Sequence, residues 1–154
     1  MTKLILRDLE EKDIPQVVAI LRKVHSISRY KEIEFDDAVV ASIAHFALAS
    51  KTNYFAKVVV NDADKVLGGL HGYLVHFIFS QKLCVQDSVV FIDPEERCGK
   101  VMNLLYEEFV AWGKQNGAVM LNLGTSSGIN EELTGKLYQR LGLTKAGELY
   151  TRSL

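Results

Sequence analysis

The residues best suited to chemistry lie where an apolar stretch gives way to a short polar one. Arg97, Cys98, Gly99 and Lys100 directly precede a run with helical spacing of apolar residues. The free N–H groups in the first turn of a helix carry the positive end of its dipole, so an anion such as a phosphate is stabilised there. Glycine lets the backbone approach an oxygen atom, and the two cations add charge. The pattern predicts an anion site, whereas residues 93–96 also fit a simple helix N-cap with a capping box.

Other titratable side chains are candidates for proton transfer. Asp87 lies in a β-type run, and strict alternation would place it on the same face as Val85, Val89 and Phe91. Burial among apolar side chains would raise the pKa of this carboxyl group toward the range of a general base. His71 and His76, on the preceding run, are alternative bases. Cys98 has no histidine or second cysteine beside it, which favours a packing role over a reactive thiol.

Length and composition indicate an ordinary globular protein. The 154 residues, 48% apolar and 24% charged, fit one domain spanning residues 1–154. A net charge of −1 argues against a nucleic-acid partner held by a global basic field. The two cysteines have no metal-ligand neighbours at short spacing, so we expect no metal. No apolar run reaches the roughly 20 residues that cross a bilayer, and none resembles a signal peptide, so we expect a cytoplasmic protein with no membrane partner.

The elements that position these residues follow from the spacing of apolar residues. The pattern predicts strands at 3–7, 54–60, 66–79, 83–92 and 118–123, and one or two final strands within 144–154. It predicts helices that begin at Asp13, at Asp36 or Asp37, after Pro94, and at Asn130. The glycines at 68, 69 and 72 indicate a bulge or a close backbone approach. The order β-α-α-β-β-β-α-β-α-β indicates an α/β (α+β) fold with a mixed, mostly antiparallel sheet flanked by helices.

Two motifs at a suitable separation resemble one protein family. Phe91-Ile92-Asp93-Pro94 leads into Arg97-Cys98-Gly99-Lys100 at a helix start, and a later helix carries Leu137-Tyr138-Gln139-Arg140-Leu141-Gly142. From about residue 66 onward the chain resembles the GNAT family, the GCN5-related N-acetyltransferases, especially small phage and bacterial members. That family usually has Arg/Gln-x-x-Gly-x-Gly/Ala at the helix start. Here Lys100 and Met102 take the positions of small residues.

The resemblance implies that acetyl-CoA binds as a co-substrate. Backbone N–H groups from Cys98 to Met102 would hold its pyrophosphate, and Arg97 or Lys100 would meet the phosphates. The backbone of Val90 and Ile92 would pair with the pantetheine arm in the manner of an added strand, and Asn130 would hydrogen-bond that arm, cap the next helix, or do both. The residues expected to contact acetyl-CoA are Val90, Phe91, Ile92, Arg97, Cys98, Gly99, Lys100, Val101, Met102 and Asn130.

The resemblance also implies an N-acetyltransferase that moves acetyl to a primary amine by direct attack in a ternary complex. Tyr138 would be the general acid for the departing thiolate, unless its ring only packs within the helix. Asp87 is the candidate base, with His71, His76 or a chain of waters as alternatives. The segment 25–34 would lie over the acceptor pocket or form a plain solvated loop. The amine, on a small molecule or on a protein, is not identified.

Two other functions are compatible with these motifs. One is a GNAT-like module that binds acyl-CoA or a protein partner without turnover. The other is a nucleotide-binding module that uses the same turn, against which the missing Walker Lys-Ser/Thr and Gly-x-Gly-x-x-Gly patterns argue. Homodimers are common in the family, and the sequence leaves the oligomeric state open.

Overall fold

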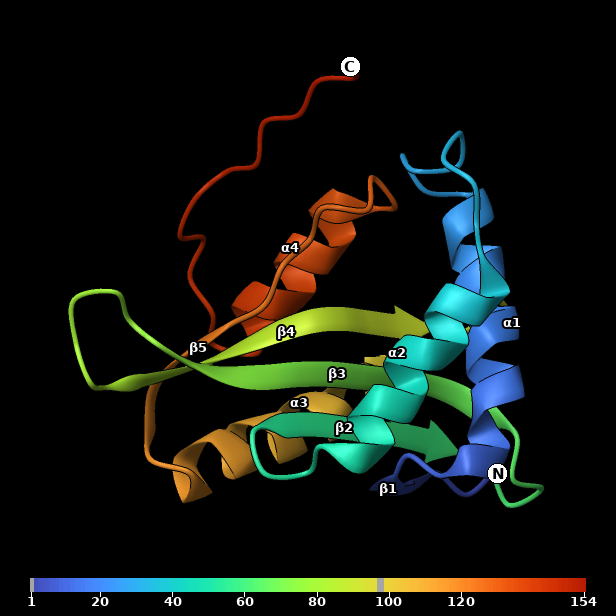
Figure 1. Cartoon of the computed structure of the whole chain (residues 1–154), viewed down its shortest axis with the longest axis horizontal. Coiled ribbons are helices and arrows are strands. Elements are labelled where there is room, and N and C mark those ends of the chain that lie inside the picture. Colours follow the sequence, from blue (N-terminus) through green and yellow to red (C-terminus); the bar gives the residue numbers. More distant parts are fainter. Residues whose placement is uncertain (1, 97–98) are drawn as a thin grey trace.

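The computed structural model describes residues 2–96 and 99–154, and a five-stranded sheet lies at its centre (Figure 1). The strands are β1 (Ile5–Asp8), β2 (Tyr54–Val60), β3 (Val66–His76), β4 (Leu83–Ile92) and β5 (Ala118–Asn122). Their spatial order is β1-β2-β3-β4-β5. All neighbours pair antiparallel except β4 and β5, which are parallel. The predicted mixed, mostly antiparallel sheet is therefore confirmed.

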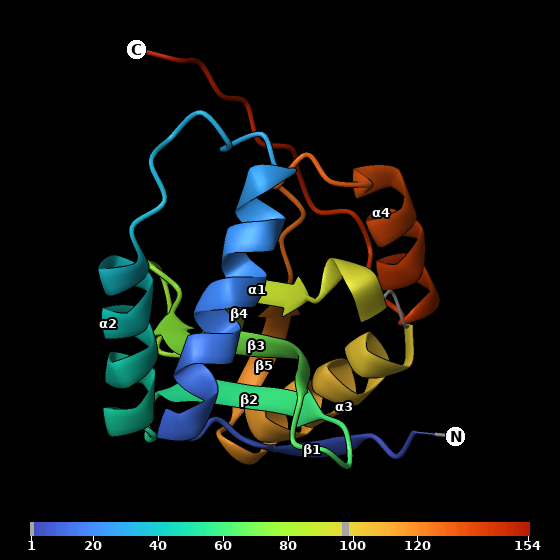
Figure 2. The same ribbon diagram turned by 90° about the vertical axis from the view of Figure 1, so that its right-hand side faces the viewer.

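Helices cover both faces of this sheet. The helices are α1 (Ile14–Ser26), α2 (Asp37–Ala49), α3 (Gly99–Gln115) and α4 (Glu131–Arg140), and two 3-10 turns span Glu11–Asp13 and Pro94–Glu96. Figure 2 shows α2 and α3 on opposite sides of the sheet. No helix in the described ranges is both long and apolar enough to cross a membrane.

Two aspartates mark the starts of α1 and α2 in different ways. The Asp36 carboxylate accepts the N–H groups of Ala38 and Val39 at 2.8 and 3.2 Å, which satisfies two free donors of α2. Asp13 also precedes its helix, but its side chain makes no capping bond there. Instead its buried carboxylate accepts both terminal nitrogens of Arg7, at 2.7 and 2.8 Å. Asp13 therefore ties β1 to the start of α1.

Alternation along β2 divides the core between the two faces of the sheet. Phe55 and Val59 pack with Leu105 and Phe109 of α3, which are fully buried. Val58 and Val60, whose side chains alternate with those of Phe55 and Val59 along the strand, pack against α1 on the other face. Successive side chains of a strand point to opposite faces, so one strand serves both layers.

A β-bulge at Ser88 shifts the pattern of β4. His71 pairs with Val89 while Gly72 pairs with Asp87, so β4 carries one extra residue. Val85, before the bulge, packs against α3, whereas Val89 and Phe91, after it, pack with α1. The expectation that Asp87 shares one face with all three was wrong, because the extra residue reverses the alternation. The predicted irregularity near the β3 glycines is confirmed.

The last predicted strands, within residues 144–154, are not formed. The described chain has no helix or strand after α4, and the terminal segment runs away from the sheet in Figure 1. Leu149 and Tyr150 are 62% and 85% exposed. The β-type composition is not sufficient, because a strand needs a neighbour with which to share hydrogen bonds.

Candidate functional site

The candidate site begins where β4 and β5 separate. Their ladder runs from the Leu83–Ala118 pair to the Gln86–Asn122 pair, but β4 continues to Ile92. In the described ranges, the second half of β4 therefore has no strand neighbour on this side. Its backbone polar groups face a cavity of about 680 Å³. An extended ligand can supply the hydrogen bonds that a sixth strand would otherwise make.

Helices and loops close this cavity, which we call the β4–β5 cavity. Its other walls are the first turn of α3, the loop 124–127 and the inner side of α4. Val24, Ile27 and Tyr30 close the end nearest α1. The cavity therefore joins a free strand edge to a helix N-terminus, where backbone N–H groups favour an anion.

Two titratable residues of the cavity are linked through Gly124. The N–H of Gly124 donates to Asp87 Oδ1 at 3.0 Å, and the Tyr138 hydroxyl donates to the carbonyl of Gly124 at 3.2 Å. Burial raises the pKa of Asp87, while the Gly124 N–H acts in the opposite direction. Burial and then the negative charge of Asp87 raise the pKa of Tyr138 to about 12. The Tyr138 phenol therefore keeps its proton at neutral pH and is able to donate it.

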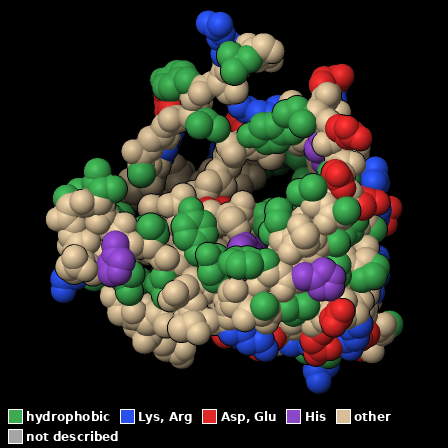
Figure 3. All heavy atoms as spheres, in the orientation of Figure 1, with side chains coloured by type: hydrophobic (Ala, Val, Ile, Leu, Met, Phe, Trp, Pro, Cys, Tyr) green, Lys and Arg blue, Asp and Glu red, His purple; other side chains and the backbone are tan. Residues whose placement is uncertain are grey.

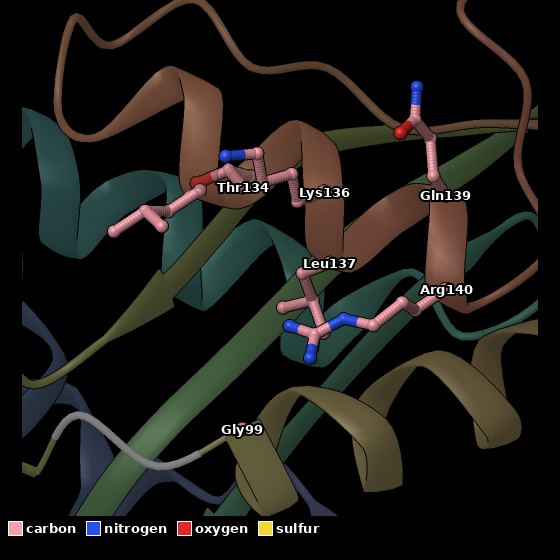
Figure 4. A pocket seen from close by; sticks show the side chains of 7 residues that line it. Gly99, Thr134, Lys136, Leu137, Gln139 and Arg140 are labelled. Atoms are coloured by element: carbon pink, nitrogen blue, oxygen red, sulfur yellow. The ribbon is translucent and has the colours of Figure 1, made fainter.

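An open depression continues from the cavity between α3 and α4 (Figure 4). It shares Gly99, Thr134 and Leu137 with the cavity and has a volume of about 910 Å³. Figure 4 shows Leu137 and Arg140 extending from α4 over the gap above Gly99, while Gln139 points away. A Cβ atom at Gly99 would meet no atom within 4 Å. The start of α3 therefore faces open space with the guanidinium of Arg140 above it.

Sequence reasoning missed Arg140 as part of this anion site. Arg140 follows Leu137 by three residues, so helical spacing places both on one side of α4. Lys136, four residues before Arg140, also lines the depression, and its ammonium pairs with Glu132 at 2.7 Å. The spacing was visible in the sequence, but the approach of α4 to α3 was not.

Most of the predicted contact residues lie around one cavity. Those lining it are Asp87, Val90, Phe91, Ile92, Gly99, Met102, Asn130 and Tyr138. Lys100 is exposed and does not line it, and Val101 is fully buried in the core. The predicted contacts of Arg97 and Cys98 lie outside the described residues.

Two of the lining residues have little side chain to offer. Phe91 and Met102 are only 6% and 2% exposed. Their contribution to ligand binding is therefore that of the backbone. Asn130 adopts a left-handed conformation with φ of 46° and makes no capping bond with its side chain. Glu131 accepts the N–H of Gly128 at 2.9 Å nearby, so the loop is held without the Asn130 amide.

The segment 25–34 folds over one end of the cavity. The N–H of Arg29 donates to the carbonyl of Ser127 at 2.8 Å, and the Tyr30 hydroxyl donates to the carbonyl of Ser126 at 3.2 Å. Arg29 also pairs with Glu131 at 3.1 Å. These contacts tie the segment to the loop after β5. Residues 31–34, all exposed, fit the alternative of a solvated loop.

The two histidines considered as bases occupy different environments. His76 Nδ1 lies 3.0 Å from the carbonyl of Gln81 in the β3–β4 hairpin, away from the cavity. His71 Nδ1 contacts the hydroxyl of Ser88, which itself lines the cavity. His71 is therefore the histidine beside the site. Nowhere in residues 2–96 or 99–154 do three His, Cys, Asp or Glu side chains gather as metal ligands.

The architecture, with a split parallel pair of strands beside a helix N-terminus, is the GNAT fold. Solved structures with this fold cover nearly the whole chain. A Trypanosoma brucei acetyltransferase matches with a TM-score of 0.73 and 18% identity, over 99% of this chain and all of that one. Glucosamine-6-phosphate N-acetyltransferase from Arabidopsis thaliana matches with a TM-score of 0.76 and 12% identity, over 98% of both chains.

A third match carries a different functional label. A transcriptional regulator from Bacillus halodurans matches with a TM-score of 0.77 and 16% identity, over 99% of this chain and all of that one. No model of a known protein family and no curated protein sequence matches the chain. At these identities the likeness shows the fold, and function must be argued from the site.

Proposed function

We propose that this protein is an N-acetyltransferase that moves the acetyl group of acetyl-CoA to a primary amine by direct attack in a ternary complex. One observation carries the proposal: the free edge of β4 opens into a cavity that also receives Tyr138 and the first turn of α3. Within this single groove, the free edge of β4 suits an extended arm, the first turn of α3 suits an anionic group, and Tyr138 suits a reacting centre. The acetyltransferases that share the fold give the proposal further support.

The residues of the groove fit the parts of acetyl-CoA. Val90 and Ile92 would offer backbone groups to the pantetheine amides along the open edge of β4. The pyrophosphate would lie at the first turn of α3, where N–H groups lack helical partners, with the guanidinium of Arg140 above it. Lys100 replaces a glycine of the family pattern without closing the site, since it is exposed and does not line the groove.

Proton transfers at the thioester would use the pair joined by Gly124. The amine nitrogen attacks the carbonyl carbon, so a C–N bond forms and the C–S bond breaks. Tyr138 would give its proton to the departing thiolate. Because its pKa is raised to about 12, the phenol still carries this proton at neutral pH. Asp87, whose pKa burial raises, would take the proton that the amine loses.

A binding module without turnover is the second candidate. The Tyr138 hydroxyl already donates its single proton to the carbonyl of Gly124, so it must exchange a partner before it can protonate a thiolate. In that case the groove would bind acyl-CoA and leave the thioester intact.

A thermal-shift series with acetyl-CoA, CoA and ATP tests the proposal. At a ligand concentration about 100 times Kd, stabilisation by about 2.7 kcal/mol would raise Tm by roughly 5–10 °C for a domain of this size. We expect both CoA species, but not ATP, to do so. Stabilisation by neither CoA species contradicts the proposal, and stabilisation by ATP alone favours a nucleotide-binding module.

Release of free CoA thiol with a panel of primary amines then separates enzyme from binder. We expect amine-dependent release of one thiol for each acetyl group transferred. Stabilisation by acetyl-CoA with no thiol release on any amine would favour the binding module.

A further inference from the structure

The loop 124–128, between β5 and α4, carries the glycine that joins Asp87 to Tyr138. Its sequence is Gly-Thr-Ser-Ser-Gly, so it has no apolar side chain to pack into a core. Figure 3 shows hydrophobic side chains gathered instead on the face that carries α2. Glycine and small hydroxyl residues also restrict the backbone weakly. The position of the loop must therefore come from hydrogen bonds to other parts of the chain.

Two residues that follow α1 supply such hydrogen bonds. The N–H of Arg29 donates to the carbonyl of Ser127 at 2.8 Å, and the Tyr30 hydroxyl donates to the carbonyl of Ser126 at 3.2 Å. Figures 1 and 2 both show the loop beside the segment that follows α1. Among the described residues, only this segment and α4 hydrogen-bond to residues 125–128 from outside the loop.

The Arg29 side chain adds a contact with the start of α4. Its guanidinium pairs with Glu131 at 3.1 Å, and the same Glu131 oxygen accepts the N–H of Gly128 at 2.9 Å. A Cβ at Gly128 would lie 3.2 Å from the Cβ of Arg29, so glycine allows this close approach. The buried Ser28, whose hydroxyl donates to the carbonyl of His25 at 2.8 Å, fixes the other side of the contact to α1. Arg29 therefore links the end of α1 to both ends of a short turn.

The path from these contacts to Gly124 is short. Ser126 follows Gly124 by two residues, and successive Cα atoms are held about 3.8 Å apart by planar peptide units. A displacement at Ser126 is therefore passed on to Gly124 with little loss. The N–H and carbonyl of Gly124 are the groups that bond to Asp87 and Tyr138.

We propose that Arg29 and Tyr30 are positioning residues that hold Gly124 where it bonds to both Asp87 and Tyr138. They act through the loop and not on a reacting atom. Arg29 lines neither the β4–β5 cavity nor the open depression, whereas Tyr30 lines the cavity at its α1 end. Arg29 is therefore the cleaner test, because it does not touch the space proposed for substrates. This inference rests on the proposed acetyltransferase function.

A matched pair of arginine substitutions tests the role of Arg29 in turnover. Arg29→Ala should lower kcat about tenfold with KM for acetyl-CoA within about threefold of wild type, since small misplacements of reacting groups slow the chemical step. Arg22 also follows α1 outside the groove and forms an exposed ion pair with Asp37 at 2.5 Å. Arg22→Ala should leave kcat within about twofold of wild type. Arg29→Lys should recover most of the loss, because one nitrogen contacts Glu131.

The pH dependence of kcat distinguishes positioning from a general loss of stability. The Gly124 N–H lowers the pKa of Asp87, which burial otherwise raises. If Gly124 moves away in Arg29→Ala, the pKa of Asp87 rises and its basic form is lost at higher pH. The acid limb of kcat should then move to higher pH by roughly half a unit or more, and Arg22→Ala should keep the wild-type limb. The same amine serves all variants, so its own titration is common to them.

NMR of the Gly124 amide reads the same hydrogen bond without turnover. Its N–H resonance should shift as Asp87 titrates, with a midpoint that is higher in Arg29→Ala than in wild type and unchanged in Arg22→Ala. If no amine gives thiol release, the acetyltransferase proposal fails and this midpoint alone decides the inference. A raised midpoint supports the positioning role in a protein without turnover, and an unchanged midpoint overturns it.

The remaining outcomes are equally decisive. An unchanged kcat in Arg29→Ala, or a lower kcat with the wild-type acid limb, overturns the positioning role while leaving the acetyltransferase proposal in place. If Arg29→Ala shows no cooperative thermal transition, Tyr30→Phe replaces it, because this change removes one hydroxyl and keeps the ring. Tyr30→Phe should move the acid limb and the Gly124 midpoint in the same direction, and wild-type values for both contradict the inference.

Discussion

Asp87 and Tyr138 belong to different elements of the fold, but both bond to the backbone of Gly124. The N–H of Gly124 donates to the Asp87 carboxylate at 3.0 Å, and its carbonyl accepts the Tyr138 hydroxyl at 3.2 Å. The negative charge of Asp87 adds to burial in raising the pKa of Tyr138. The protonation states of the two groups are therefore coupled, and both line the groove proposed for acetyl-CoA.

Replacing Tyr138 by phenylalanine should lower the rate of acetyl transfer. The change removes the proton that would go to the thiolate, and such acid–base groups typically contribute about 10²–10⁴-fold to kcat. We expect at least a 10²-fold fall in kcat with KM for acetyl-CoA within about threefold of wild type, measured by thiol release.

Tyr106→Phe is the matched control for this change. The Tyr106 hydroxyl donates to the carbonyl of Leu141 at 3.0 Å and does not line either groove. Both variants lose one tyrosine hydrogen bond, worth about 1 kcal/mol of stability. A similar kcat for the two variants would remove Tyr138 from the acid role.

The free energy of unfolding should depend on the Tyr138 proton at alkaline pH. The folded pKa of about 12 exceeds the ordinary value of 10.0, so the folded state holds this proton more tightly than the unfolded chain. The contribution is fully present below pH 10, and it is lost as pH rises through 12. Its size is about 2–3 kcal/mol for two units of pKa.

Denaturant unfolding from pH 9 to 12 measures this dependence. The exposed Tyr150 and several lysines also titrate in this range, so the informative quantity is the difference between wild type and Tyr138→Phe. That difference should shrink as pH rises from 10 toward 12. A difference that stays constant with pH contradicts the buried, protonated phenol.

Substituting Arg140 by glutamine should weaken the binding of acetyl-CoA. Removing one guanidinium beside a phosphate typically costs about 1.4 kcal/mol or more, which is a tenfold rise in Kd. The affinity should also depend less on salt concentration. Titration calorimetry at two ionic strengths tests this expectation.

Arg152→Gln removes the same charge from the exposed terminal segment. It should leave Kd within about twofold of wild type, because that segment does not line the groove. An equal effect of both substitutions would mean that only the overall charge of the protein is involved.

Two glycine-to-alanine changes should have opposite effects on stability. A Cβ at Gly72 would lie 2.6 Å from the ring of Phe109, so Gly72→Ala should destabilise the fold by about 1–3 kcal/mol. A Cβ at Gly135, within α4, would meet no atom within 4 Å. Gly135→Ala should stabilise by about 0.4–1 kcal/mol, because alanine has less freedom in the unfolded chain. Tm values that move in the same direction for both would contradict the packing of β3 on α3.

The strand β4 shows how far the sequence alone could carry the prediction. Apolar spacing predicted its bounds correctly, from Leu83 to Ile92, since these depend on local composition. The orientation of Asp87 was not predictable in the same way. It depends on the extra residue Ser88, which appears only when β4 is aligned with β3.

Longer-range relationships account for the other differences. Arg140 was missed because its role depends on the approach of α4 to α3, and the terminal strands were expected from composition although no partner strand is present. A small apolar cavity between the sheet, α1 and α2 likewise depends on how two helices meet the sheet.

The bulge at Ser88 also makes the length of β4 matter, because it divides the strand into two parts that pack on opposite faces of the sheet. Deleting this one residue would restore simple alternation and turn Val89 and Phe91 from the α1 side toward α3. Apolar side chains would then crowd the α3 core, and the β4–β5 cavity would lose part of its wall. A one-residue change in the length of β4 should therefore disturb the fold more than an apolar substitution within either part. The number of residues in β4 therefore decides which of its side chains face α1 and which face α3.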